Sequence, residues 1–170
     1  NILSTIGNTP LVRLDKIKKK YNLHSNIVGK LEFFNPLGSV KDRIALNMIE
    51  DAERLGIIKP GSTIVESTSG NTGLGMAMIA AERGYKFIAI VDGHAAEDKI
   101  RIMKAYGAQI IKLDSHNSSL ATADREALAE QMSLNNPDIY WTKQHDNPAN
   151  AQIYINTLAN ELLEATNNKI

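Results

Sequence analysis

The stretch Thr68-Ser69-Gly70-Asn71-Thr72-Gly73 decides the expected fold, because it joins a short apolar run to a long helical one. Residues 63–66 predict a strand, and the Ala-, Met- and Leu-rich segment 74–83 predicts a helix. A strand–loop–helix of this kind directs backbone N–H groups, hydroxyls and an amide toward one point at a helix N-terminus, where an anion is favoured. Gly70 and Gly73 permit a close backbone approach. Ordinary helix caps use the same residue types, so the stretch alone leaves both interpretations open.

Strand and helix patterns alternate on both sides of this stretch. Besides 63–66, strands are expected at 11–14, 27–33, 86–91, 109–113 and 138–141. Helices are expected at 15–21, 39–55, 71–83, 95–106, 118–134 and 149–165. Short strands that alternate with helices of 11 or more residues predict parallel strands with helical crossovers. The fold class is therefore α/β, with a doubly wound and mainly parallel sheet.

The composition favours a globular enzyme or binding protein over several other classes. Nineteen basic residues balance nineteen acidic ones, so the charge indicates neither a nucleic-acid partner nor a membrane surface. No apolar run approaches the roughly 20 residues needed to cross a bilayer. The absence of cysteine excludes disulfides and thiolate metal sites and fits a cytoplasmic protein.

Lys41 is unusual for its position, near the expected start of the helix at 39–55. Helix N-termini favour acidic side chains, and their dipole disfavours a protonated amine. A deprotonated lysine is a good Schiff-base former. Ser39 and Asp42 also approximate a capping box, however, and the lysine could simply extend into solvent.

Other polar residues give weaker signals. The histidines, at positions 24, 94, 116 and 145, lack the spacing of metal ligands. Asp92 follows a strand about 20 residues after the glycine loop, as in dinucleotide-binding proteins, but the glycine spacing of that fingerprint is missing. Tyr140 and Trp141 are expected to belong to the core.

Five motifs that occur in order give the chain a resemblance to a known family. They are Ile6-Gly7-Asn8-Thr9-Pro10-Leu11, Asn35-Pro36-Leu37-Gly38-Ser39-Val40-Lys41-Asp42-Arg43, Glu66-Ser67-Thr68-Ser69-Gly70-Asn71-Thr72-Gly73, Ala105-Tyr106-Gly107-Ala108 and Gln144-x-Asp146-Asn147-Pro148-Ala149-Asn150. Together they resemble the N-terminal half of the cysteine synthase (O-acetylserine sulfhydrylase) and cystathionine β-synthase family. This family belongs to the pyridoxal-phosphate enzymes of the tryptophan-synthase β fold.

The resemblance implies a role for each matched position. Lys41 would form the Schiff base with pyridoxal 5'-phosphate and act as acid and base at the substrate Cα. Asn71 would hydrogen-bond the cofactor's ring oxygen. The amino-acid carboxylate would be held by the loop and by a distant glutamine, namely Thr68, Ser69, Gly70, Thr72 and Gln144. The implied reaction is β-replacement on an O-activated serine, with cysteine synthase preferred and cystathionine β-synthase or another β-replacing synthase as the alternative.

Two departures from the family pattern leave the substrates open. Family members commonly carry Pro-x-x-Met-Ser after the strand that ends here at Val91, where this chain has Asp92-Gly93-His94-Ala95-Ala96. Cysteine synthases usually have an aromatic residue after the glutamine, where this chain has His145. Serine, phosphoserine or O-acetylserine could be the donor, and sulfide, homocysteine or another nucleophile could be the acceptor.

The resemblance also predicts a domain plan and an assembly. Residues 1–40 would pack on a large domain, 41–150 would form a small mobile domain, and 151–170 would lead back to the large domain. The family's phosphate-binding loop would lie beyond residue 170, so we expect the C-terminal part of the fold to be missing. The 170-residue chain would then bind cofactor weakly and be inactive, whereas the longer enzyme would be a homodimer. The competing hypothesis is a catalytically incompetent fragment or binding module with the same half-fold.

Overall fold

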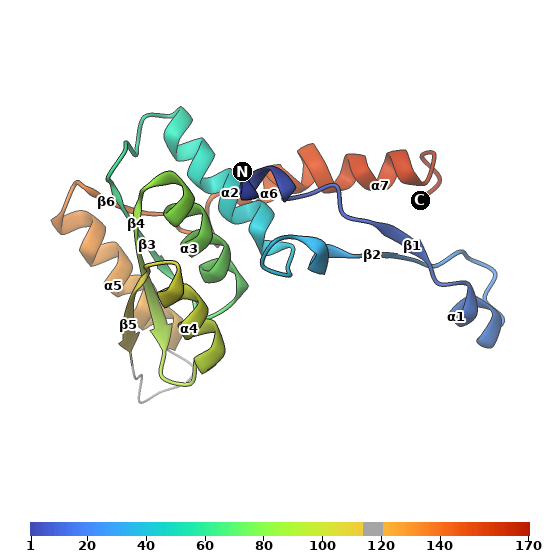
Figure 1. Ribbon diagram of the computed structural model, residues 1–170, viewed down its shortest axis with the longest axis horizontal. Helices are drawn as coiled ribbons and strands as arrows, with labels where there is room; N and C mark the ends of the chain where they lie inside the picture. The colour runs from blue at the N-terminus through green and yellow to red at the C-terminus, as the bar shows by residue number, and fades with distance from the viewer. Residues whose placement is uncertain (114–120) are drawn as a thin grey trace.

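The computed structural model describes residues 1–113 and 121–170 of the chain. Figure 1 shows a sheet covered by helices and, beside it, an extended arm in which the N-terminal strands and the C-terminal helix run away from the sheet. Residues from the strands and from the end of that helix line a common groove, which places the two segments side by side. No helix in the described ranges is both long and apolar enough to cross a membrane.

The elements have the following bounds. The strands are β1 (Leu11–Arg13), β2 (Val28–Lys30), β3 (Thr63–Ser67), β4 (Lys86–Asp92), β5 (Gln109–Leu113) and β6 (Ile139–Trp141). The α-helices are α1 (Asp15–Lys20), α2 (Lys41–Arg54), α3 (Asn71–Arg83), α4 (Glu97–Ala105), α5 (Ala121–Asn135), α6 (Pro148–Ile153) and α7 (Ala159–Ala165). Short 3-10 turns span Ile2–Thr5 and Glu32–Phe34, and a π-helical turn, Tyr154–Leu158, joins α6 to α7.

The main sheet has the strand order β5-β4-β3-β6, and all its neighbouring pairs are parallel. Thr63 of β3 lies opposite Lys86 of β4 on one side and Ile139 of β6 on the other. The carboxyl ends of these strands therefore meet at one edge of the sheet, where ligands of such folds bind. Strands β1 and β2 form a separate antiparallel pair in the arm.

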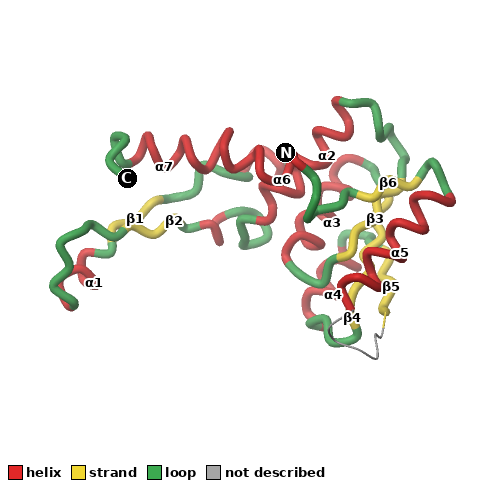
Figure 2. Tube along the Cα trace, turned by 180° about the vertical axis from the view of Figure 1, so that it is seen from behind, coloured by secondary structure: helices red, strands yellow, loops and turns green. Residues whose placement is uncertain are grey.

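Two apolar layers cover the sheet, as a doubly wound fold requires. Ile64 of β3 faces a large core shared with α2, α3 and α4, whereas its neighbour Val65 faces a smaller core beneath α5. This alternation follows from the two-residue period of a strand. Figure 2 shows α5 on the face of the sheet opposite α3. The predicted α/β doubly wound class is confirmed.

Two expected elements differ in detail from the structure, and a third lies partly outside the described residues. The strand expected at 27–33 ends at Lys30, and the chain then turns outward so that Phe33 and Phe34 are exposed. The helix expected at 149–165 begins at Pro148 and changes to a π turn after Ile153. The Thr157 hydroxyl in this turn donates back to the Ile153 carbonyl at 2.6 Å. Residues 118–120 of the helix expected at 118–134 lie outside the described residues, as does His116.

Candidate active site

The loop between β3 and α3 lies at the carboxyl edge of the sheet, as predicted. Gly70 is the N-cap of α3, and no side chain caps that helix at the N-cap position. One hydroxyl does satisfy a helix N–H, since Thr68 Oγ1 accepts from the Gly73 N–H at 3.0 Å. Among the described residues, the Asn71 and Thr72 backbone N–H groups donate to no protein acceptor. The loop is therefore partly capped and keeps donors directed outward, which suits an anion.

Gly73 permits the tight packing of this loop. A Cβ at this position would lie 2.9 Å from Thr68 Cγ2 and 2.9 Å from Met103 Sδ. Both separations are far shorter than an ordinary carbon contact, so an alanine would push Thr68 outward. At Gly70, by contrast, an added Cβ would meet no atom within 4 Å.

Lys41 is the first residue of α2, and it faces the loop across a cavity of about 320 Å³. The cavity is lined by Lys41, Ser67, Thr68, Ser69, Gly70, Asn71, Thr72, Thr122, Arg125, Gln144 and His145. The Lys41 side chain makes no hydrogen bond or ion pair with any other described residue. Lys41 is half-buried and borders this cavity, which is the position that the Schiff-base interpretation requires.

The capping box expected at the start of α2 does not form. Ser39 Oγ accepts from the Lys41 N–H at 3.1 Å, one residue before the Asp42 N–H that a capping box would use. The carboxylate of Asp42 does not return to Ser39, because it accepts from the Leu37 N–H at 2.8 Å. Burial raises the pKa of Asp42 to about 6, despite this hydrogen bond, and nearby Glu32 adds to the rise.

Gln144 is held against the loop by a buried carboxylate. Its Nε2 donates to the Ser67 carbonyl at 2.8 Å, and its backbone N–H donates to Glu66 Oε2 at 3.1 Å. Glu66 also accepts from the Ser67 N–H and from the Thr142 hydroxyl. Burial raises the pKa of Glu66, and these donors oppose the rise. Glu66 thus ties the end of β3 to the chain segment that carries Gln144.

Arg125 and Asp92 form a second polar contact at the cavity, and the sequence motifs did not single out Arg125. Arg125 of α5 donates to Asp92 Oδ2 at 3.1 Å and to Ser67 Oγ at 3.3 Å. The Asp92 N–H in turn donates to Ser69 Oγ at 2.9 Å. The adjacent Ser69 hydroxyl, together with the His94 N–H and Arg125, lowers the pKa of Asp92 against the effect of burial. The only feature of the sequence that pointed to this contact was the position of Asp92 directly after an expected strand.

The structure brings every predicted site residue to one cavity. Lys41, the loop residues Thr68, Ser69, Gly70, Asn71 and Thr72, and Gln144 all line it. His145 lines it as well, whereas His24 and His94 do not. The described residues contain no cluster of His, Cys, Asp or Glu that could hold a metal ion.

The cavity fits an aldehyde cofactor and an amino-acid carboxylate. Neither the Lys41 amine nor the Asn71 side-chain amide has a partner among the described residues. An amine can attach to an aldehyde, an amide can hydrogen-bond a ring oxygen, and the α3 N-terminus can receive a carboxylate. Within the described residues, no second glycine-rich loop adjoins the cavity to receive a phosphate.

Comparisons with known proteins agree with this chemistry. A family model described as "Pyridoxal-phosphate dependent enzyme" matches residues 2–170. Cystathionine beta-synthase of Oryctolagus cuniculus is 39% identical over 170 residues, which are 100% of this chain and 31% of that protein. Cysteine synthase of a Flavobacterium species is 42% identical over 164 residues, which are 96% of this chain and 52% of that protein.

A solved structure shows the same arrangement of elements. A hydrogen sulfide-producing enzyme from Fusobacterium nucleatum matches with a TM-score of 0.90 and 38% identity, over 100% of this chain and 55% of that one. The chain therefore spans about a third to a half of the length of these relatives. With a family model that covers nearly all of its residues, the chain belongs to the pyridoxal-phosphate-dependent enzymes.

Proposed function

We propose that this protein catalyses β-replacement on a serine whose hydroxyl carries a leaving group. The preferred reaction is that of a cysteine synthase, in which O-acetylserine and sulfide give cysteine and acetate. One observation carries the proposal: a lysine without a partner, an N–H-rich loop and a fixed glutamine from distant parts of the chain share one cavity. A loop that served only as a capped turn would not require the lysine and the glutamine beside it.

In this proposal the loop and Gln144 bind the amino-acid carboxylate. Thr68, Ser69 and Thr72 offer hydroxyls, and Gly70 leaves room for the carboxylate to reach the backbone. The α3 N-terminus stabilises the negative charge. The 2.8 Å bond to the Ser67 carbonyl holds the Gln144 amide beside the loop, and the substrate carboxylate would take the second N–H in place of the longer, 3.4 Å contact with Glu66 Oε1.

Lys41 is the proposed attachment point for the cofactor and the group that moves the proton at Cα. When bound, pyridoxal phosphate supplies an electron sink for the carbon bonds of the amino acid. Lys41 must then hold its amine within hydrogen-bond reach of the Cα proton, and the carboxylate site sets that distance. Asn71 would orient the cofactor ring through its oxygen.

The donor and the acceptor are less constrained than the reaction class. Cystathionine β-synthase activity, with homocysteine as the acceptor, is the second candidate, because relatives with both names match this chain at similar identity. Arg125 and His145 line the cavity, and Asp92, one of the residues that depart from the family pattern, pairs with Arg125. These residues are the proposed source of any difference in substrate.

The domain plan and assembly are further parts of this proposal. Residues 41–150 would move as a small domain, while 1–40 and 151–170 would pack on a large domain. The exposed Phe33, Phe34 and Ile155 in the arm support such a contact. A homodimer in the cytoplasm is proposed for the longer enzyme, and light scattering of the purified protein would test the dimer.

A visible absorption spectrum tests the function. The longest protein that contains this sequence would be purified, together with Lys41→Ala and the control Lys59→Ala from an exposed turn. Added pyridoxal phosphate should give a protonated Schiff-base band in the parent and the control but not in Lys41→Ala. O-acetylserine, phosphoserine and serine would then be added in turn, each with sulfide or homocysteine. A parent without a Lys41-dependent band would contradict the enzyme and favour a binding module.

A further inference from the structure

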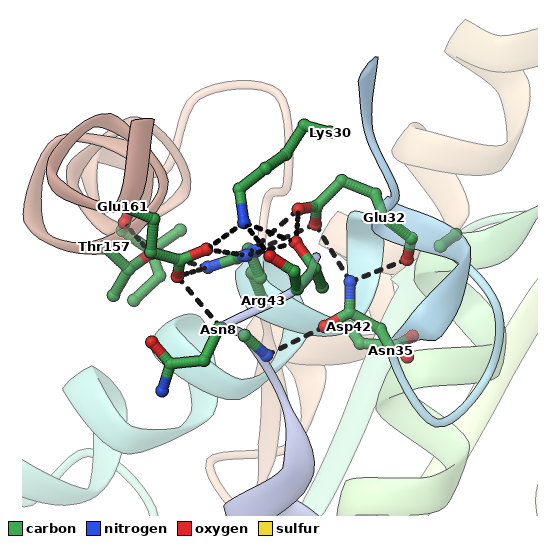
Figure 3. Close-up of polar contacts among 12 residues, drawn as sticks. Asn8, Lys30, Glu32, Asn35, Asp42, Arg43, Thr157 and Glu161 are labelled. Carbon is green, nitrogen blue, oxygen red and sulfur yellow. Dashed lines mark hydrogen bonds and ion pairs between the residues drawn. The ribbon is translucent and has the colours of Figure 1, made fainter. Parts of the chain in front are cut away.

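A buried polar cluster lies next to the start of α2, outside the cavity. Figure 3 shows Arg43 at its centre, between Glu32 near the end of the β1–β2 arm and Glu161 of α7. The Arg43 side chain is only 1% exposed. We call these three residues, together with Lys30 and Thr9, the Arg43 cluster.

Arg43 bonds both carboxylates in a bidentate manner. Its Nε and Nη2 donate to the two oxygens of Glu32 at 2.9 and 3.0 Å. Its Nη1 and Nη2 donate to the two oxygens of Glu161 at 2.6 and 2.8 Å. A guanidinium that meets two carboxylates with this geometry is strongly oriented. Arg43 therefore fixes three separate chain segments relative to one another.

The charges of the Arg43 cluster balance. Lys30 Nζ lies 2.5 Å from Glu161 Oε2, so two cations face two carboxylates. Burial lowers the pKa of Arg43, but the hydrogen bonds of Glu161 and Glu32 more than reverse this and keep the guanidinium charged. Hydrogen bonds from Arg43 lower the pKa of Glu161 to about 2, against the opposing effect of burial. Arg43 and Glu161 are thus both ionised at neutral pH.

The first turn of α2 depends on such contacts because its own cap is weak. The N-cap is Val40, whose side chain cannot accept a hydrogen bond. The next three residues point in different directions, since a helix turns by about 100° per residue. Lys41 faces the cavity, Asp42 accepts from the Leu37 N–H, and Arg43 enters the cluster.

We propose that Arg43 is a positioning residue, which holds the first turn of α2 in place and thereby sets the position of Lys41. The inference rests on the proposed role of Lys41 and extends it to a residue that does not touch the cavity. Loss of Arg43 would free the first turn to fray, and a shift of the reacting group by about 1 Å can lower a rate about 100-fold.

The test compares Arg43→Met and Arg43→Lys with the control Arg83→Met in the longest available protein. Arg83 suits the comparison because it also pairs with two carboxylates, Glu50 and Glu53, but near the far end of α2. Hydrogen exchange of the cofactor-free proteins would report the mobility of residues 39–45. Visible spectra and steady-state kinetics of the loaded proteins would report the position of Lys41.

We expect exchange in residues 39–45 to rise about tenfold or more in Arg43→Met and to stay unchanged in Arg83→Met. The kcat of Arg43→Met should fall about 100-fold with a small change in KM, and Arg43→Lys should recover part of the lost kcat.

If exchange in residues 39–45 and kcat were the same in Arg43→Met as in the wild type, the inference would be overturned, even if the melting temperature fell. If Arg43→Met does not fold, Glu161→Gln replaces it and should show the same pattern in weaker form. A wild type without a Lys41-dependent band would refute the proposed function, whereas faster exchange would still support the anchoring of the first turn.

Discussion

The Gln144 side chain donates a hydrogen bond to the Ser67 carbonyl at 2.8 Å, although 77 positions separate the two residues in the chain. This bond joins the segment after β6 to the end of β3, and it fixes an amide beside the anion-binding loop. Further hydrogen bonds join the same segments: Glu66 accepts from the backbone and the side chain of Gln144 and from the Thr142 hydroxyl, and the Thr142 N–H donates to the Val65 carbonyl.

Replacement of Gln144 by alanine should weaken substrate binding more than it weakens the fold. A hydrogen bond to a charged group contributes about 1.5–3 kcal/mol, so the KM for the amino-acid donor should rise about 10- to 100-fold. The backbone link to Glu66 persists, so the melting temperature should change little. Steady-state kinetics measure this change. The control is Gln152→Ala, which removes an exposed amide on α6. An unchanged donor KM in Gln144→Ala would remove Gln144 from the site.

Gly73→Ala and Gly70→Ala should have different effects on stability, although both lie in one loop. At Gly73 the new Cβ collides with Thr68 Cγ2, and overpacking of this kind costs about 1–3 kcal/mol. At Gly70 the new Cβ meets no atom within 4 Å, and the φ of −125° is open to alanine. Urea unfolding of the two variants measures the difference. Equal stabilities would show that the loop can relax around the added methyl group.

Asp42 should make the protein less stable as the pH rises from about 4 to about 6. Its pKa is about 6 in the folded protein and 3.8 ordinarily, so the folded state holds the proton more tightly. The favourable contribution is present below pH 4, and up to about 3 kcal/mol of it is lost by neutral pH. Asp42→Asn should flatten this part of the stability profile. Urea unfolding at pH 4 and pH 7 gives the slope, with Asp51→Asn on the same helix as the control.

Glu161 should make the protein less stable as the pH falls from about 4.5 toward 2, the opposite pH dependence to that of Asp42. Arg43 holds its pKa at about 2, against an ordinary value of 4.5, so the folded state favours the ionised carboxylate. This contribution is present above pH 4.5 and is lost as the pH falls toward 2; its size is about 3 kcal/mol. Glu161→Gln should lower the stability at neutral pH and remove the loss in acid. The exposed neighbour Glu164 provides the control Glu164→Gln, and a similar acid profile in both variants would contradict the argument.

The sequence by itself determined the fold class. Alternating strand and helix patterns around the Thr68–Gly73 loop predict parallel strands, because each local period reports directly on one element. Parallel strands end at one edge of the sheet, so the loop and Gln144 were expected to lie near each other. Lys41 and Asn71, which the family resemblance assigns to one site, line the same cavity.

Tertiary structure decided the contacts that no local period records. Arg125 reaches Asp92 only because α5 packs across β3 and β4, and Arg43 meets Glu161 only because α7 returns beside the arm. A distant contact also accompanies the early end of β2, because Glu32, two residues after the strand ends at Lys30, pairs with Arg43. Such pairings join side chains that are distant in the chain, so no local pattern in the sequence records them.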